Sequence, residues 1–283
     1  MSAGDHPVST ARAAFERVGA LTRGSLFSVV DLLAYIGGVT RLLLAVLNGV
    51  RLSLMRSGTR VHLSTVLAQC HRFGVRSIPI VILVHLFIGF ILALNMAPTL
   101  ALYGQTDQIA TIVAIAIVRE LGPLFTAILL TGLAGASIAA ELGAMVEGEE
   151  IKALRAMALD PIRFLVAPRI IAAAIMMLGL TVIADVVGIL GGMLTCVHVL
   201  NQTTAGYLDL TRLAITNSDY LTGLSKAFVF GVVVAGLACY EGLNVKGGSE
   251  GVGRATTTTV VKSIVALIAT DGVFTAVYYA LGV

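Results

Sequence analysis

The chain has 283 residues, of which 57% are hydrophobic and only 12% are charged, with a formal net charge of +3. A soluble domain typically carries about 25% charged residues, so this chain has too few charges to cover so much apolar surface. The composition argues against a soluble enzyme, a disordered chain and a nucleic-acid binder. It indicates that lipid surrounds most of the protein.

The first 75 residues are expected to form cytoplasmic or interfacial amphipathic helices. Apolar side chains between residues 11 and 18 recur at helical spacing. The next stretch, residues 26–54, is apolar but is interrupted by Asp31, Arg41, Asn48 and Arg51. This pattern favours helices that lie in the membrane interface over an additional crossing.

Five later stretches are long and apolar enough to cross a membrane, which takes about 20 residues. They cover about 78–103, 109–145, 162–200, 221–240 and 260–281. The second and third exceed one plain crossing, so they must tilt, protrude or break at their glycines. The expected fold is therefore an all-α membrane protein in which residues 76–283 form a transmembrane domain of five helices.

The positions of Lys and Arg predict the orientation of these helices. Sixteen of the 19 cations lie before the first span, in residues 147–169, or in residues 241–262. The two loops that alternate with these regions, residues 104–108 and 201–220, hold one cation, Arg212. Because cytoplasmic loops are rich in Lys and Arg, we expect a cytoplasmic N-terminus and an extracytoplasmic C-terminus.

Several ionisable residues lie within or at the ends of the spans: Arg119, Glu120, Glu141, Asp185, Lys226 and Asp271. A charge at the bilayer centre costs roughly 2.5–3.5 kcal/mol on an insertion scale unless it is paired or faces water. Neighbouring side chains on a helix point about 100° apart, so Arg119 and Glu120 are expected to pair with other helices. Lys226 and Asp271 are the candidate partners. Structural ion pairs and a polar cavity or gate both remain open as roles.

The segment between the second and third spans predicts a short amphipathic helix over about 147–158. Its three Glu residues suit the positive end of the helix dipole, and Ile151 and Leu154 line one face. Asp160 and Pro161 end the helix. Such a helix either presses its apolar face into a groove on a partner protein or lies on lipid headgroups.

Residues 248–255 approach a phosphate-binding loop but have Arg254 and Ala255 where that motif has Lys and a hydroxyl residue. No soluble strand precedes them, so the required context is missing. We expect a flexible cytoplasmic turn there, and another chain to bind ATP. His85 and His198 are isolated in apolar runs, so neither a metal site nor a catalytic constellation is expected.

Three stretches together resemble the MlaE/YrbE family, the permease subunits of ABC transporters that work with MCE-domain proteins in lipid traffic. They are IVRELGPLFTAILLTGLAGASIAAELGAM (117–145), EEIKALRAMALDPIRFLVAPR (149–169) and EGLNVKGGSEGVGRATTTTVV (241–261). The resemblance runs from about residue 74 to the C-terminus. The chain departs from the family pattern at His85, where small or apolar residues are usual, and at Leu133, where the family often has Arg.

The resemblance implies a permease of the bacterial inner membrane that forms a dimer, here expected to be a homodimer, with a lipid cavity between its halves. It would move phospholipid or a related lipid to or from an extracytoplasmic MCE protein. A separate ATPase subunit would bind ATP and Mg²⁺, so this chain itself would be non-catalytic and hold no cofactor.

The resemblance also assigns residues to three roles. The lipid-binding positions are Leu92, Thr99, Leu100 and Tyr103. The embedded charged positions are Arg119, Glu120, Lys226 and Asp271. The ATPase-coupling helix carries Glu147, Glu149, Glu150, Ile151, Leu154, Arg155 and Met157.

The leading alternative is an ion-coupled secondary transporter in which Glu120, Asp185 or Asp271 carries a proton near the bilayer midplane. The sequence shows no inverted repeat, which counts against it. An intramembrane enzyme and a scaffold that transports nothing are further alternatives.

Overall fold

A computed structural model describes residues 30–51 and 63–282. The chain divides into two compact units, residues 1–45 and 46–283. The first described element is a continuous helix, Val30–Arg51. Its length and composition would allow a crossing, and its expected place in the interface stays a prediction. The amphipathic stripe at residues 11–18 lies outside the described residues.

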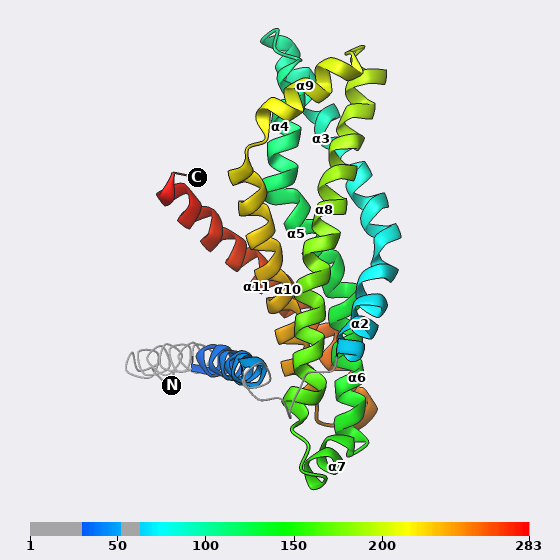
Figure 1. Cartoon of the computed structure of the whole chain (residues 1–283), viewed down its shortest axis with the longest axis vertical. Helices are drawn as coiled ribbons and strands as arrows, with labels where there is room; N and C mark the ends of the chain where they lie inside the picture. The colour runs from blue at the N-terminus through cyan, green and yellow to red at the C-terminus, as the bar shows by residue number, and fades with distance from the viewer. Residues whose placement is uncertain (1–29, 52–62, 283) are drawn as a thin grey trace, which may run out of the picture. The chain divides into compact units, whose positions relative to one another are not determined.

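The rest of the described chain is helical and contains no strand (Figure 1). The α-helices are α2 (Leu63–Gln69), α3 (Ile78–Leu102), α4 (Gln108–Ala116), α5 (Gly122–Leu130), α6 (Ala136–Glu147), α7 (Glu150–Ala156), α8 (Ala167–His198), α9 (Thr204–Ala214), α10 (Asn217–Leu243) and α11 (Gly248–Leu281). This confirms the all-α expectation. Helices satisfy their own backbone hydrogen bonds, which lipid cannot do.

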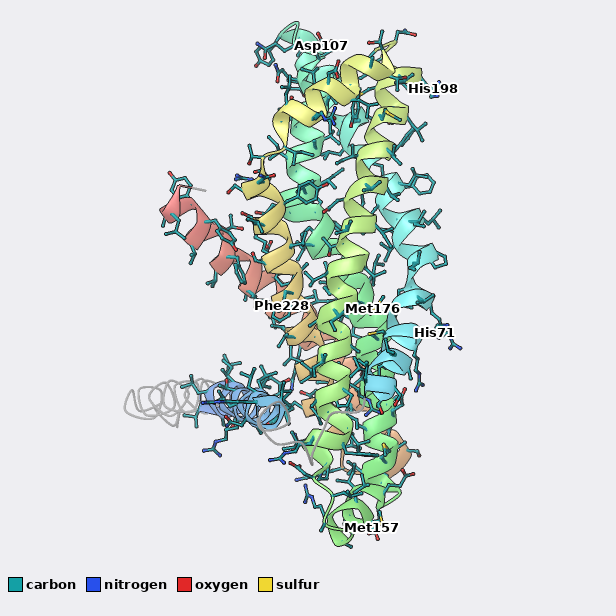
Figure 2. The ribbon with its side chains drawn as sticks, viewed as in Figure 1. His71, Asp107, Met157, Met176, His198 and Phe228 are labelled. Carbon is teal, nitrogen blue, oxygen red and sulfur yellow. The ribbon has the colours of Figure 1, made fainter. Side chains whose placement is uncertain are left out.

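These elements form five long rods, each long and apolar enough to cross a membrane. They cover Leu63–Leu102, Gln108–Glu147, Ile162–His198, Asn217–Leu243 and Gly248–Leu281. Each rod contains one of the five predicted stretches, or all but a few terminal residues of it. Figure 2 shows Asp107 and His198 at one end of the rods and Met157 at the other, with Met176 and Phe228 between. We call these the α9 end and the α7 end.

The second rod is interrupted by two π-helical turns, Ile117–Leu121 and Thr131–Gly135. The first of them directly precedes Gly122 and Pro123, and proline lacks the N–H that an ordinary α-turn would use. A widened turn absorbs this defect without ending the helix. The second rod therefore stays continuous and is only locally distorted beside its glycines, whereas α8 continues as one α-helix over 32 residues.

Glycines bring α3 and α8 into backbone contact. A Cβ atom at Gly89 would lie 1.8 Å from the carbonyl oxygen of Gly188, and one at Gly191 would lie 2.1 Å from that of Leu86. Such distances exclude any side chain, so the two helices pack along glycine faces. Small residues allow this close approach in lipid, where the hydrophobic effect gives helices no drive to associate.

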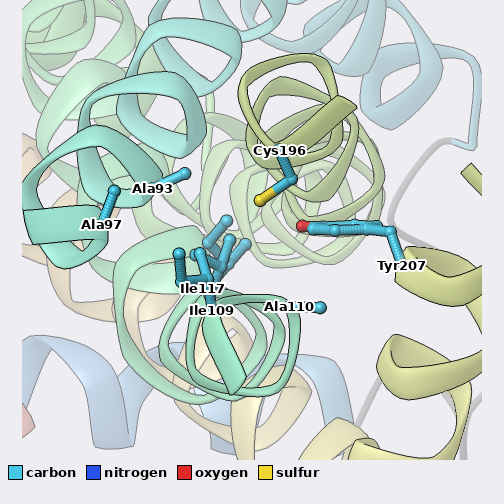
Figure 3. Packing of buried hydrophobic residues seen from close by; sticks show 8 residues of the cluster. Ala93, Ala97, Ile109, Ala110, Ile117, Cys196 and Tyr207 are labelled. Carbon is cyan, nitrogen blue, oxygen red and sulfur yellow. The ribbon is translucent and has the colours of Figure 1, made fainter. Parts of the chain in front are cut away.

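At the α9 end, one apolar cluster joins α3, α4, α8 and α9 (Figure 3). Ala93 and Ala97 of α3 face Ile109 of α4, and Cys196 of α8 completes the cluster with Tyr207 of α9. The Tyr207 hydroxyl donates to the carbonyl of Ile189 at 3.2 Å. Burial raises the pKa of Tyr207, so it remains a neutral donor that fastens α9 to the rods.

The prediction of a flexible turn over residues 248–255 is wrong. These residues form the first two turns of α11, which follow Gly247 in a left-handed conformation with φ +97°. A Cβ at Gly251 would lie 2.2 Å from the carbonyl oxygen of Lys246, and Ala255 is buried. Packing against the preceding loop therefore holds this glycine-rich segment helical.

Candidate functional site

Lys226 of α10 is the centre of a buried ionic cluster. Its side chain is only 1% exposed, and its Nζ lies 2.5 Å from Glu120 Oε2 and 2.9 Å from Asp271 Oδ1. It also donates to Thr275 Oγ1 at 3.0 Å, and Thr275 donates to Glu120 Oε1 at 3.1 Å. We call these four residues the Lys226 cluster.

The Lys226 cluster connects three elements that are distant in sequence. Glu120 lies in the first π-turn of the second rod, Lys226 in α10, and Asp271 with Thr275 in α11. Two carboxylates around one ammonium neutralise the Lys226 charge in an apolar bundle, where an unpaired charge is costly. Glu120 is 37% exposed, so one side of the cluster faces the surface of the chain.

Arg119 does not join this cluster, although it precedes Glu120. It forms an ion pair with Asp219 at the start of α10. Asp219 also accepts hydrogen bonds from the backbone N–H and the hydroxyl of Thr216, each at 2.7 Å, and so completes a capping box. One carboxylate therefore caps α10 and neutralises Arg119.

Glu141 of α6 is the centre of a second ionic cluster. It lies 2.5 Å from Arg72 and 3.2 Å from Arg169, and it accepts a hydrogen bond from Ser137 at 3.1 Å. Arg169 also donates to the carbonyl of Leu165 at 2.8 Å. Arg72, Ser137, Glu141 and Arg169 form the Glu141 cluster, which ties the segment before α3 to α6 and to the start of α8.

The short helix at the α7 end begins later than predicted. Gly148 ends α6, and Glu149 follows in a left-handed conformation with φ +59°. Glu147 therefore belongs to α6, and α7 itself covers Glu150–Ala156. Lys152 donates to Glu149 at 2.6 Å, and this hydrogen bond lowers the pKa of the carboxyl.

The predicted coupling residues divide into an anchor and an exposed surface. Ile151 is buried and Leu154 is half-buried, in agreement with one apolar face. The others are exposed: Glu147, Glu149, Glu150, Arg155 and Met157. The exposed surface is what a docking partner would meet, and that role stays a prediction.

The four predicted lipid positions lie in the second half of α3 and the turn after it. Leu92 and Leu100 pack against the apolar cluster of the α9 end. Thr99 and Tyr103 are exposed, Tyr103 by 74%. The first pair is therefore partly exposed and the second pair more so, and lipid binding at all four stays a prediction.

Residues 66–277 match the family model described as Permease MlaE. The chain belongs to the MlaE permease family. It is 38% identical over 215 residues to a probable ABC transporter permease of Rickettsia typhi, covering 76% of this chain and 83% of the relative. It is 34% identical over 224 residues to the intermembrane phospholipid transport system permease MlaE of Haemophilus influenzae, covering 79% and 86%.

A plant relative extends the likeness beyond bacteria. The chloroplastic protein TRIGALACTOSYLDIACYLGLYCEROL 1 of Arabidopsis thaliana is 30% identical over 220 residues, covering 78% of this chain and 63% of that protein. The Lys226 cluster, the Glu141 cluster and α7 all lie within the residues that match the family model. This chain is thus an ABC transporter permease and a multi-pass membrane protein.

Sequence reasoning missed Asp219 and Arg169 as ionic partners. The signal for Asp219 is the spacing Thr216-x-x-Asp219, which is typical of a capping box. This signal was missed because the fourth predicted span starts only at residue 221, five residues after Thr216. Arg169 carries no local signal, because its pairing with Glu141 depends on how α8 packs against α6.

Proposed function

We propose that this MlaE-family permease moves phospholipid or a related lipid between the bacterial inner membrane and an extracytoplasmic MCE-domain protein. The observation that carries the proposal is the family match over residues 66–277. The Haemophilus relative, which matches over most of its length, has a name that records intermembrane phospholipid transport.

A separate ATPase subunit supplies the energy in this proposal, and it docks on α7. Support comes from the exposed side chains of α7 and the turn before it. Residues 248–255 are helical, and they do not form a phosphate-binding loop. Following the family match, ATP and Mg²⁺ are assigned to the ATPase in this proposal, and the permease chain is assigned no catalytic step and no cofactor.

A second permease copy completes the transporter in this proposal. One face of α11 supports it, because Val261, Val265 and Ile268 are each 58–64% exposed at helical spacing. Native mass spectrometry of the purified complex measures the copy number directly. A complex with one permease per ATPase pair would contradict the homodimer.

Movement would pass from α7 to the rods through the Glu141 cluster. Glu141 lies on α6 just before α7, and Arg169 lies on α8 just after it. A pull on α7 therefore acts on both rods at once and on the segment that carries Arg72. The rods then tilt against each other, and the second half of α3, with the turn after it, becomes accessible to lipid. This part of the chain carries Leu92, Thr99, Leu100 and Tyr103.

The test measures ATP hydrolysis and lipid movement on the same liposomes, which contain the permease purified with its ATPase. Glu150→Arg reverses an exposed charge on α7 and is expected to lower the lipid moved per ATP. Glu250→Arg, an exposed Glu at the start of α11, is the matched control and should leave this ratio unchanged. Unchanged coupling in Glu150→Arg would refute the assignment of α7.

The same liposomes address the alternative of an ion-coupled transporter. Glu120 and Asp271 are held by Lys226, so neither is available as a mobile proton carrier while the Lys226 cluster is intact. Transport that continues without nucleotide and stops with a proton ionophore would replace the ATP-driven proposal. Transport that requires ATP and survives the ionophore would support it.

A further inference from the structure

Asp185 lies in the middle of α8, and the ionic clusters do not explain it. Its side chain is fully buried, with 0% exposure. Neither carboxylate oxygen has a hydrogen-bond partner among the described residues, and none of those residues forms an ion pair with it. Buried polar groups are nearly always hydrogen-bonded, so this carboxyl requires an explanation.

The backbone of the second rod presses directly against this carboxyl. A Cβ at Gly122 would lie 1.9 Å from Asp185 Oδ1 and 2.9 Å from the carbonyl oxygen of Ile117. Only glycine leaves room for Asp185 at this place. Gly122 directly follows the first π-turn, and π-turns inside α-helices are frequent at functional sites.

Two further buried polar side chains, Thr126 and Thr181, lie one helical turn from the contact between Gly122 and Asp185. Gly122 faces Asp185, and Ile117 faces Gly188, so the second rod and α8 run antiparallel. Thr126, four residues after Gly122, is therefore level with Thr181, four residues before Asp185. Both threonines are fully buried, and the Thr181 hydroxyl has no partner among the described residues.

His85 of α3 reaches the same level. Its Nδ1 donates to the carbonyl of Val81 at 2.9 Å, and its Nε2 lies 3.4 Å from the hydroxyl of Thr126. The ring is fully buried. We call His85, Thr126, Thr181 and Asp185 the Asp185 cluster; it lies between α3, α5 and α8.

The charged and titratable groups around Asp185 are few. The titratable group from α3 is the His85 ring. The one from α10 is the Tyr220 hydroxyl, which interacts electrostatically with Asp185. The neighbouring π-turn carries Arg119 and Glu120, which are paired with Asp219 and Lys226. Arg119 and Lys226 are thus engaged with other carboxylates, and no cation of the described residues forms an ion pair with Asp185.

We propose that Asp185 is a proton-binding site. In this packed conformation its carboxyl is the neutral acid, and internal water connects it to the free hydroxyl of Thr181. A buried carboxyl without a counter-ion binds a proton because an unpaired charge in an apolar interior is far costlier than a neutral acid. A water between two such groups satisfies both, as buried waters generally do.

A metal ion fits this place less well than a proton. Hard cations take six or more oxygen ligands, and the unpartnered oxygens here are the two of Asp185 and the one of Thr181. The site is therefore assigned to a proton, which needs only one carboxylate oxygen.

The proton also links the site to movement of the rods. If α5 separates from α8 and water enters, the carboxyl can ionise and its proton passes to that water. Repacking then requires the proton to return. This last step rests on the proposed transport cycle, whereas protonation in the packed state does not.

Infrared spectroscopy of the full-length chain in lipid nanodiscs tests the proposal without any transport assay. The difference between wild type and Asp185→Asn at neutral pH should contain the C=O band of a carboxylic acid, shifted in D₂O. Asp209→Asn, which changes an exposed Asp on α9, is the matched control and should remove carboxylate bands alone. A wild-type spectrum without the acid band would overturn the proposal.

Two further measurements keep the test decisive if Asp185→Asn does not fold. Thr181→Val removes the hydroxyl but keeps the shape, and it should shift the acid band of Asp185 without removing it. The band should also be indifferent to sodium, and its loss on adding sodium chloride would overturn the proposal in favour of a cation. An unshifted band in Thr181→Val would refute the water connection to Asp185.

Stability provides the independent readout. Because the packed state holds a proton that the unfolded chain releases, wild type should lose thermal stability relative to Asp185→Asn as the pH rises. Parallel stability curves for the two proteins would contradict protonation. A failure of ATP-driven lipid movement would leave these spectra and curves unchanged, so the two proposals fail separately.

Discussion

Replacing Lys226 by methionine keeps a long side chain in the Lys226 cluster but removes its positive charge. Glu120 and Asp271 then face each other without the ammonium that separates them. Breaking a buried ion pair by removing one partner costs about 3–5 kcal/mol. Lys226 is 1% exposed and Asp271 16%, but Glu120 is 37% exposed, so solvent screens part of its contribution. We expect a loss of about 3 kcal/mol in the free energy of unfolding.

The measurement is a denaturant titration of the purified chain in mixed micelles. Lys246→Met, which removes an exposed Lys at the α7 end, is the matched control and should change stability by no more than about 0.5 kcal/mol. The triple variant Lys226→Met, Glu120→Gln, Asp271→Asn should recover most of the loss, because neutral replacements leave no charge unpaired. Equal stability of Lys226→Met and Lys246→Met would refute the reasoning.

Three further predictions concern packing, capping and pH. Gly89→Ala should strongly destabilise the chain in thermal unfolding, because its Cβ would lie 1.8 Å from a carbonyl oxygen of α8. The control Gly179→Ala, whose Cβ would meet nothing within 4 Å, should leave the free energy of unfolding unchanged or raise it by up to about 1 kcal/mol. Asp219→Asn weakens the capping box of α10 and removes the negative charge that pairs with Arg119. It should therefore cost more in the same assay than the roughly 1 kcal/mol of a lost cap. Lys152 lowers the pKa of Glu149, so their ion pair is present at pH values above the ordinary pKa of that carboxyl and is lost as the pH falls through the lowered pKa. Amide exchange of the α7 turn should rise at this lower pH in wild type but not in Lys152→Met.

The rods were predictable because their signal is local. About 20 apolar residues in a row indicate a crossing in any context, and the five predicted stretches fall on the five rods of residues 63–281 to within a few residues. The π-turn before Gly122 was partly predictable as well, since Gly-Pro within an apolar run marks a defect in an α-helix. Its exact form depends on how Asp185 packs against Gly122, which no local pattern contains.

The ionic partners were less predictable because each pair joins residues that are distant in sequence. Arg119 and Glu120 are adjacent and of opposite charge, yet they bind residues at the start and middle of α10, Asp219 and Lys226. Hydropathy indicates that such charges need partners but does not name them. The prediction of a turn over residues 248–255 was wrong for a different reason. The local signal of a polar, glycine-rich stretch favours a turn, but packing against Lys246 holds the segment helical.

The kinds of contact between the rods indicate which parts can move against each other. The α3–α8 contact is backbone against backbone at Gly89 and Gly191, so these helices have no side chains there that could adjust to sliding. Cores packed in this way are displaced as units. By contrast, α11 has only 11% of its most apolar stretch buried in the chain. Its second half is attached to α10 through Lys226 and through a hydrogen bond between Ser225 and Tyr278. Polar side chains can exchange partners at such a boundary without opening a cavity. Rearrangement of the bundle is therefore expected where α11 meets α10, with α3 and α8 moving together.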